Sequence, residues 1–273
     1  MKLFIVSLSL GIVFTACITL PRGASLGATD EVPSAAQHPH SLVEEHSFED
    51  ATATRAFFAQ DRIRPGAWEI SKELASHGLA SVKITMRKGD LTEHERERAE
   101  LRDKSIPLGR DVWYRIDMFI PFGFPILKNN LILMQLKQAG DNNPLYSVRF
   151  SEGNMFVRQR FDDVQVDYDL KEMTPRLGTW NRFVAHMKVS RGDDGILDVW
   201  LNNTQIVAYR GKTAYESEGE VTYFKFGLYR DITDVSMTIF YDNFRRGTAF
   251  AEVVPEGASN LERALIEGKR KKK

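Results

Sequence analysis

The 273 residues of this chain include 37 Lys and Arg against 37 Asp and Glu, so the formal net charge at pH 7 is zero. This balance provides no global positive field for nucleic acid or another polyanion, and any attraction for an acidic partner must be local. A hydrophobic content of 42% is normal for a globular core, and the length suits one large domain or two small ones.

The N-terminus predicts export. Lys2 precedes an apolar run over residues 3–16, which is too short to span a membrane but has the size of a secretory signal. We expect a signal peptide over residues 1–27; alternatively, residues 14–17 form an imperfect lipobox, with lipid anchoring at Cys17. Because Cys17 is the only cysteine, the mature domain has no disulfide and depends on core packing. We therefore expect a secreted or periplasmic monomer without a membrane span.

A flexible leader is expected before the folded domain. Residues 28–47 mix Pro, Ala, Ser, His and Glu without periodicity. Their histidines, His38, His40 and His46, could suggest a metal site but are expected to be solvated. No linker interrupts the chain beyond them, so we expect one domain over residues 48–250, beginning near Phe48.

Short strands with turns between them are expected throughout this domain. Turn chemistry occurs at residues 88–90, 152–154, 193–195 and 202–203. This spacing predicts an all-β fold, an antiparallel sandwich or jelly roll. The predicted strands cover residues 67–70, 80–87, 98–102, 111–120, 131–138, 145–150, 155–161, 181–190, 196–201, 205–209, 222–229 and 236–244.

The composition changes beyond Gly247. No helical periodicity is found before residue 258, and residues 260–267 are predicted to form a short helix. The chain then ends in five positive charges at residues 269–273, within a basic tail over residues 251–273. Such a run is expected to be solvated, with binding to an envelope or a polyanion as the alternative.

Three of the predicted strands have a polar face. At the period of two that a strand imposes, residues 223–229 place Phe224, Phe226 and Leu228 on an apolar face. The opposite face has Tyr223, Lys225, Gly227 and Tyr229, where the glycine allows close approach to the backbone. The same alternation aligns Arg98, Glu100 and Arg102 on one strand, and Gln135 and Lys137 at the end of another.

If these faces line one concave sheet, they form a groove for an acidic polysaccharide. Arginines offer bidentate bonds to carboxylates, and tyrosines offer flat faces to sugar rings. The chemistry available is β-elimination: Gln135 and an arginine bind the uronate carboxylate and stabilise the enolate-like intermediate, while a base removes the C5 proton. Tyr229 could act as base, as acid, or as both, and Lys137 could act as base only if its pKa fell well below about 10.4.

Each of these features also has a purely structural interpretation. Arg98, Glu100 and Arg102 could form a salt-bridge ladder on a solvated face, and Tyr229 could be a core or rim phenol. The functional hypothesis gains from three strands that share the same kind of polar face.

At these residues the sequence resembles the jelly-roll polysaccharide lyases of the alginate-lyase and heparin-lyase type. That family has an Arg-x-Glu-Leu-Arg block, a Gln-x-His block and a Tyr-Phe-Lys-x-Gly-x-Tyr block, which correspond here to residues 98–102, 135–137 and 223–229. The segments 178–181, 198–202 and 241–244 also fit, and the resemblance covers roughly residues 48–247. It implies a concanavalin-like jelly roll of two antiparallel sheets.

The resemblance also implies roles for these residues. Arg98 or Arg102 would bind substrate, Gln135 would neutralise the carboxylate, and Tyr229 would be the catalytic acid or base. The family's histidine is Lys137 here, so either Tyr229 serves twice, Lys137 substitutes, or the protein only binds glycans. Lys225, Tyr223 and Glu100 are expected to contact substrate. His77, His94 and His186 are not assigned to the groove, and His186 is expected to be structural.

Two rival functions remain. A non-catalytic carbohydrate-binding jelly roll predicts glycan binding without cleavage. A glycoside hydrolase needs paired carboxylates about 5 to 10 Å apart, whereas the candidates at residues 162–163 and 193–194 resemble turn residues. The sequence predicts no cofactor and leaves open a structural calcium ion and the identity of the uronate.

Overall fold

The computed structural model describes residues 43–52, 57–59, 64–90, 96–128, 131–170 and 177–255. The predicted signal peptide, the helix expected at residues 260–267 and the basic C-terminal run lie outside them. Within the described residues no helix has the length and hydrophobicity needed to cross a bilayer.

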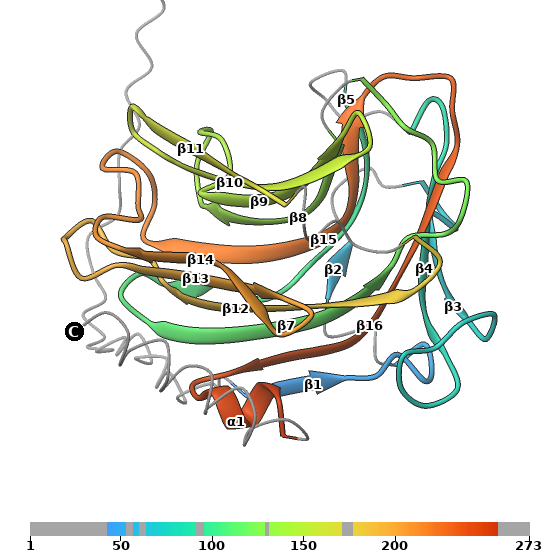
Figure 1. The fold of residues 1–273 in the computed structure, drawn as a ribbon, viewed down its shortest axis with the longest axis horizontal. Helices are drawn as coiled ribbons and strands as arrows, with labels where there is room; N and C mark the ends of the chain where they lie inside the picture. The colour runs from blue at the N-terminus through green and yellow to red at the C-terminus, as the bar shows by residue number, and fades with distance from the viewer. Residues whose placement is uncertain are drawn as a thin grey trace, which may run out of the picture. The chain divides into compact units, whose positions relative to one another are not determined.

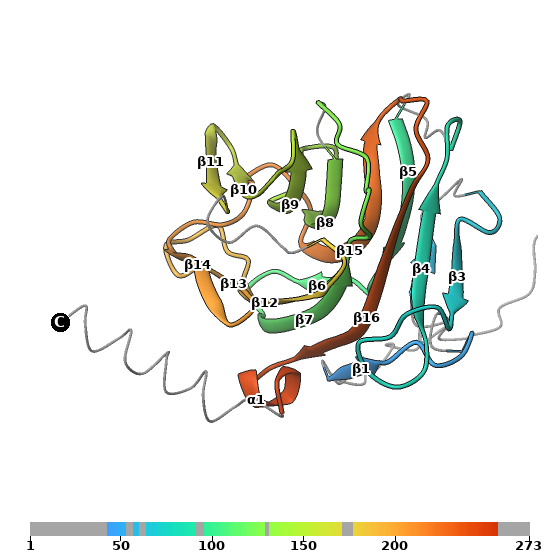
Figure 2. The same ribbon diagram turned by 45° about the vertical axis from the view of Figure 1, so that its right-hand side comes forward.

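Two antiparallel sheets form the fold, which confirms the predicted all-β jelly roll (Figures 1 and 2). The first sheet has the order β14 (Thr204–Arg210), β13 (Ile196–Leu201), β12 (Trp180–Lys188), β7 (Asp111–Phe119), β16 (Met237–Gly247), β4 (Ser81–Met86) and β3 (Trp68–Ser71), with β1 (Glu44–His46) paired to β16. The second has the order β11 (Val164–Asp169), β10 (Asn154–Phe161), β9 (Tyr146–Ser151), β8 (Leu131–Gln138), β15 (Val221–Asp231), β5 (Arg96–Arg102) and β2 (Phe58–Ala59), with β6 (Ile106–Pro107) paired to β15.

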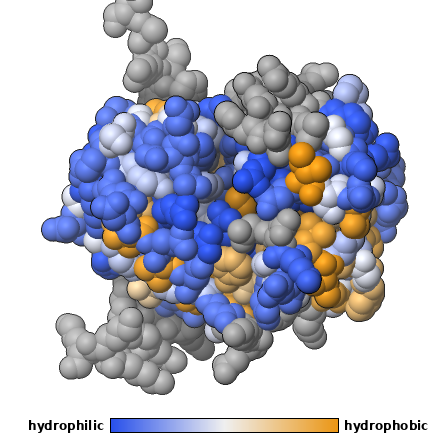
Figure 3. All heavy atoms as spheres, turned by 90° about the horizontal axis from the view of Figure 1, so that it is seen from above, coloured by the Kyte–Doolittle hydropathy of each residue, from blue (hydrophilic) through white to orange (hydrophobic). Residues whose placement is uncertain are grey.

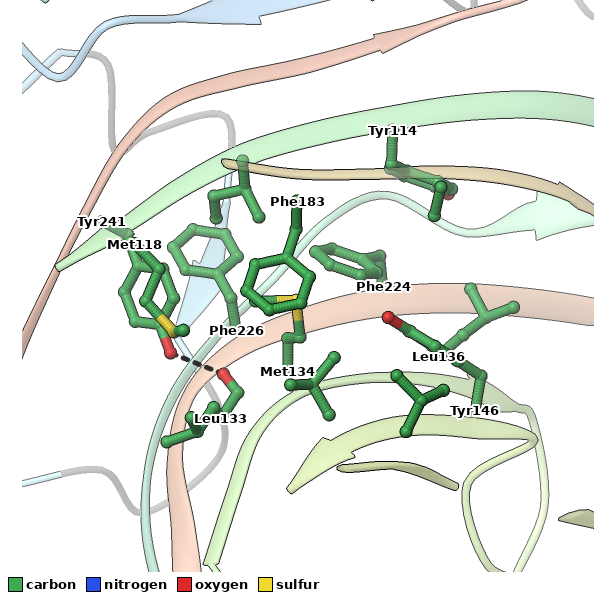
Figure 4. Close-up of a cluster of buried hydrophobic side chains, with 14 of the residues drawn as sticks. Tyr114, Met118, Leu133, Met134, Leu136, Tyr146, Phe183, Phe224, Phe226 and Tyr241 are labelled. Carbon is green, nitrogen blue, oxygen red and sulfur yellow. Dashed lines mark hydrogen bonds between the residues drawn. The ribbon is translucent and has the colours of Figure 1, made fainter. Parts of the chain in front are cut away.

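The hydrophobic core lies between the sheets (Figure 4). Alternation sends Phe224 and Phe226 of β15 inward, where the ring of Phe224 stacks on Tyr114 of β7 with centroids 4.9 Å apart. Tyr241 of β16 also belongs to this core, and its ring lies edge-on to Phe226 at 5.2 Å. The other face of β15 is therefore free to carry polar groups away from the core.

Several short elements were not predicted from the sequence. β11 was not predicted because its side chains are mostly exposed on both faces, as expected of an edge strand that pairs with β10 alone among the described strands. β1, β2 and β6 have only two or three residues each. A single helical turn, α1 (Phe250–Val253), occurs where no helix was expected; it packs through Phe250 on Trp113, with ring centroids 5.4 Å apart.

The first sheet begins slightly before Phe48, where the domain was expected to start. β1 already pairs with β16 through Glu44, Glu45 and His46. Contrary to expectation, His46 is not freely solvated. Its ring centroid lies 5.0 Å from that of Phe57, and its Nε2 is 3.3 Å from a carboxylate oxygen of Glu44.

Candidate active site

An open groove of about 1500 Å³ lies on the face of the second sheet that points away from the core. The surface around this hollow is mainly hydrophilic when seen from above (Figure 3). Six of the eight residues selected from the sequence line the groove together, from β5, β8 and β15: Arg98, Gln135, Lys137, Tyr223, Lys225 and Tyr229.

Strand register explains why these side chains meet. Tyr223 lies opposite Lys137, and Lys225 lies opposite Gln135, in the pairing of β15 with β8. On its other side β15 pairs with β5, where Tyr229 lies opposite Arg98. Side chains of directly opposed residues stand on the same face of a sheet, so the three polar faces become one surface.

Glu100 does not line the groove, contrary to the expectation that it contacts substrate. Its side chain is 0% exposed and accepts a 2.6 Å hydrogen bond from Nε2 of Gln135. Its second oxygen lies 3.2 Å from Nε of Arg98 and 3.9 Å from Nζ of Lys225. Glu100 is therefore the buried counter-ion beneath the groove, and it orients the Gln135 amide.

Arginine–tyrosine stacking orders the two phenols. The guanidinium carbon of Arg98 lies 4.5 Å from the ring centroid of Tyr229, and that of Arg102 lies 3.9 Å from the ring of Tyr223. Arg102 is not among the groove-lining residues, and it donates a 2.8 Å hydrogen bond to Ser105. Burial raises the pKa of Tyr223 despite the opposing charges of Arg102 and Arg98.

The Tyr229 hydroxyl has no hydrogen-bond partner within the part of the chain that the structure describes. It faces the groove as a free phenol. This hydroxyl is therefore available to give a proton to a bound ligand, and its phenolate form can take one from it.

Both groove lysines are partly desolvated. Burial, together with the positive charges of Arg98 and Lys137, lowers the pKa of Lys225 to about 8 against the attraction of Glu100. Burial also lowers the pKa of Lys137, while Glu218 and Asp141 oppose the shift. The direction for Lys137 is the one that a lysine base requires.

Lys137 is also bound to the loop after β8. Its Nζ donates a hydrogen bond of 2.7 Å to the carbonyl oxygen of Gly140 and another to that of Asn142. A neutral amine can keep both bonds and still have its lone pair free, so these contacts are compatible with a base at this position.

Two irregularities in the sheet determine the positions of the groove side chains. The register of β15 against β8 shifts between Phe226 and Tyr229, and that of β8 against β9 shifts between Ile132 and Met134. As a result Ile132 faces the groove while Leu133 and Met134 both join the core. Such bulges re-aim side chains and are frequent beside active sites.

Gly227, in the β15 irregularity, has a structural role that the sequence pattern does not predict. Its φ is +139°, and a Cβ there would lie 2.2 Å from the carbonyl oxygen of Ala99. The group that approaches this glycine closely is therefore the neighbouring strand β5, rather than a ligand.

A tyrosine of the first sheet supports both irregularities. The Tyr241 hydroxyl shares its proton between the carbonyl oxygens of Leu133, at 2.6 Å, and Gly227, at 3.0 Å (Figure 4). Both carbonyls belong to residues at the register shifts. The hydrogen bonds compensate for ladder interactions that the bulges disrupt.

Sequence reasoning missed the basic side chains on the far strands of the groove. Arg149 of β9 and Arg158 and Arg160 of β10 line it too. The signal was present, because these arginines alternate with Val148, Val157 and other core residues at the period of two.

The described histidines lie elsewhere. The ring of His186, on β12 of the first sheet, stacks on Trp113 with centroids 4.1 Å apart, and its Nε2 lies 2.6 Å from a carboxylate oxygen of Asp111. His77 is not among the groove residues, and His94 lies outside the described residues. No group of three or more His, Cys, Asp or Glu residues within the described ranges is placed to hold a metal ion.

The groove is thus suited to an anionic ligand and to proton transfer. The Gln135 amide and the cations Arg98 and Lys225 surround a position that a carboxylate can occupy. Tyr229 and Lys137, whose side chains are able to transfer protons, face the same space.

Comparison with known proteins agrees with this geometry. A family model described as "Polysaccharide lyase" matches residues 40–245. An endo-β-1,4-glucuronan lyase from the fungus Trichoderma reesei has a similar structure, with 15% sequence identity, a TM-score of 0.60, and coverage of 72% of this chain and 92% of its own.

Two further solved structures are similar at a TM-score of 0.54, each covering 76% of this chain and 97% of its own: the cellulose induced protein Cip1, at 17% identity, and the alginate lyase Aly36B, at 12% identity. No curated protein sequence matches the chain. At these identities the structural likeness supports the fold, and the family follows from the sequence model.

Proposed function

Since this chain belongs to the polysaccharide lyase family, we propose that it cleaves a uronic-acid-containing polysaccharide by β-elimination in the groove of its second sheet. The observation that carries the proposal is the free phenol of Tyr229 in the same groove as the buried Gln135 amide and the cations Arg98 and Lys225. Arg98 and Lys225 share one buried counter-ion, Glu100, so a neutral sugar chain would leave part of their positive charge uncompensated, whereas a uronate carboxylate would neutralise it.

The uronate carboxylate would be bound by Gln135 and Arg98. One amide proton of Gln135 is engaged by Glu100, at 2.6 Å, and the other is available to a substrate oxygen. Charge that moves into the carboxylate when the C5 proton leaves is then stabilised by donors that are already in place.

Elimination breaks the C5–H and C4–O4 bonds and forms the C4=C5 double bond. A base takes the C5 proton, the electron pair moves through the enolate-like intermediate, and O4 leaves with a proton from an acid. Tyr229 would serve as the acid and, as a phenolate, as the base; Lys137 is the alternative base because its pKa is lowered by burial. The product has an unsaturated uronate at its new non-reducing end.

The test is to incubate the purified domain with alginate, glucuronan and an unsulfated heparin-type chain while ultraviolet absorbance is recorded. Rising absorbance from an unsaturated product is expected with at least one of these chains. Tight binding of a uronate chain without any such product would contradict elimination and leave a groove that only binds glycans.

We also propose that the protein is exported, from the signal-like segment at residues 1–27. Expression of the full chain followed by fractionation should place the activity outside the cytoplasm. A Cys17→Ser variant that leaves the membrane fraction, while the parent remains there, would indicate lipid anchoring instead of free secretion.

A further inference from the structure

The three groove arginines on β9 and β10 have no role in the elimination described above. Arg149 lies on β9, and Arg158 and Arg160 lie at alternate positions of β10. All three line the groove. Arg149 is the most enclosed, with 7% of its surface exposed.

The charges in this cluster are not balanced. Arg158 is paired with Asp167 through two hydrogen bonds of 2.7 and 2.6 Å, and Arg160 donates to the amide oxygen of Gln165. Arg149 donates to the Ser147 hydroxyl at 2.8 Å and has no carboxylate partner in the part of the chain that the structure describes.

Arg149 is therefore a buried cation beside two others. Burial, together with the positive charges of Arg158 and Arg160, lowers its pKa to about 10. Desolvating an unpaired charge destabilises the folded protein unless an anion compensates for it. Perturbed groups in a cleft with such an arrangement are typical of binding sites.

The cluster lies beside the groups that perform the chemistry. Across the sheet, Tyr229 lies opposite Ile132, and Ile132 lies opposite Arg149. Neighbouring strands are about 4.8 Å apart, so the backbone of Arg149 is roughly 10 Å from that of Tyr229. A chain that crosses the strands therefore presents one sugar to Tyr229 and a nearby sugar to Arg149.

We propose that Arg149, supported by Arg158 and Arg160, binds the carboxylate of a second uronate close to the one that reacts. The inference rests on the proposed function and makes it more specific. The groove then selects polysaccharides with carboxylates on consecutive sugars over chains in which uronate alternates with an uncharged sugar.

Binding measured without turnover tests the proposal. In a Tyr229→Phe background, calorimetry would compare an oligomer of the preferred homopolyuronate with an unsulfated oligomer of alternating uronate and N-acetylhexosamine. Arg149→Gln should weaken binding of the homopolyuronate by about 10- to 100-fold, the effect of losing a charge-assisted hydrogen bond, and should change binding of the alternating chain little. Arg160→Gln, at a less enclosed position, should act in the same direction.

Arg110→Gln is the matched control, because it removes a positive charge from an exposed residue outside the groove and should leave both affinities unchanged. Arg149→Gln should also raise the melting temperature, since it removes an uncompensated buried charge. Unchanged homopolyuronate affinity in both groove variants, or equal losses for the two oligomers, would overturn the subsite but leave the proposed function standing. If the background protein binds neither oligomer, both the subsite and the proposed function are wrong.

Discussion

Among individual residues, Glu100 shows how the groove depends on a group that substrate does not reach. Its carboxylate is fully buried, holds the Gln135 amide and lies near both Arg98 and Lys225. The carboxylate therefore holds charged groups of the site close together despite their mutual repulsion.

Replacing Glu100 with Gln should shift the pH profile of kcat/KM. Lys225 binds a carboxylate only when it is protonated, so activity should fall as the pH rises through its pKa of about 8. Glu100 raises that pKa, and without its charge the alkaline fall should begin at a lower pH. Glu69→Gln, which removes an exposed carboxylate of the first sheet, should leave the profile in place. An unshifted profile in Glu100→Gln would show that Lys225 does not control this limb.

Tyr229→Phe should nearly abolish cleavage while binding persists. Loss of a general acid or base typically costs about 10²- to 10⁴-fold in rate. The ring would still stack under Arg98, at 4.5 Å in the parent, so the groove shape should be kept. The measurement is kcat from product absorbance, together with the Kd of an oligouronate. If Tyr229→Phe cleaves at the parent rate, Tyr229 is neither the acid nor the base of the reaction.

Lys137→His should keep most of the activity or increase it. An imidazole with an unperturbed pKa of about 6.5 needs less adjustment than an ammonium to act as a base near neutral pH. The cost is the loss of hydrogen bonds to the Gly140 and Asn142 carbonyls. Steady-state kinetics should show less than about a 10-fold change, against the 10² or more expected on losing an essential base. Lys137→Met provides the comparison without a titrating group.

Within the strands, alternation predicts the groove face of β15 and bulges explain what alternation cannot. Tyr223, Lys225 and Tyr229 were placed correctly because β15 keeps its period of two against β5. Ile132 was assigned to neither face, because residues 131–134 are all apolar; in the structure the irregularity in β8 turns it towards the groove. An apolar run contains no signal for such a reversal.

The burial of Glu100 was equally invisible in the sequence, since it depends on which side chains oppose it across β5, β15 and β8. The arginines of β9 and β10 could have been predicted from the sequence, because their alternation with core residues is as regular as that of β15. The residue pattern therefore predicts the strands and their faces, while local register and counter-ions depend on the three-dimensional structure.

Gly227→Ala should destabilise the protein by more than about 1 kcal/mol, because its φ of +139° is unsuited to alanine and the new Cβ would meet the Ala99 carbonyl at 2.2 Å. Gly89→Ala separates the two causes: φ is +87° there, but no atom lies within 4 Å of the added Cβ. Denaturant unfolding should show a clearly larger loss for Gly227→Ala. Equal losses would mean that backbone conformation alone requires the glycine.

For the molecule as a whole, the Tyr241 hydroxyl links the two sheets beneath the groove. Tyr241 belongs to β16 of the first sheet and bonds to Leu133 and Gly227 of the second. The shape of the groove therefore depends on how the two sheets pack, although every described residue that lines it comes from the second sheet or its loops.

Tyr241→Phe should lower the free energy of unfolding by about 1 to 3 kcal/mol, since it removes the hydroxyl donor from buried carbonyls, and should reduce kcat through the displaced bulges. Tyr215→Phe is the matched control, because the buried Tyr215 hydroxyl has no hydrogen-bond partner within the described residues. That control should be neutral or stabilising in thermal unfolding and should keep full activity. Parent-like stability in Tyr241→Phe would show that the carbonyls are satisfied without it.

The Tyr241 bond also limits how this groove can be reused. A designer who grafts β5, β8 and β15 onto another scaffold would transfer every predicted catalytic side chain, but would omit the donor that satisfies the bulge carbonyls. The graft would then be free to relax towards regular pairing, which would turn Ile132 and its neighbours to other faces. The transferable unit is consequently the pair of sheets, and a recipient scaffold needs a phenol at the position of Tyr241 before it needs Tyr229.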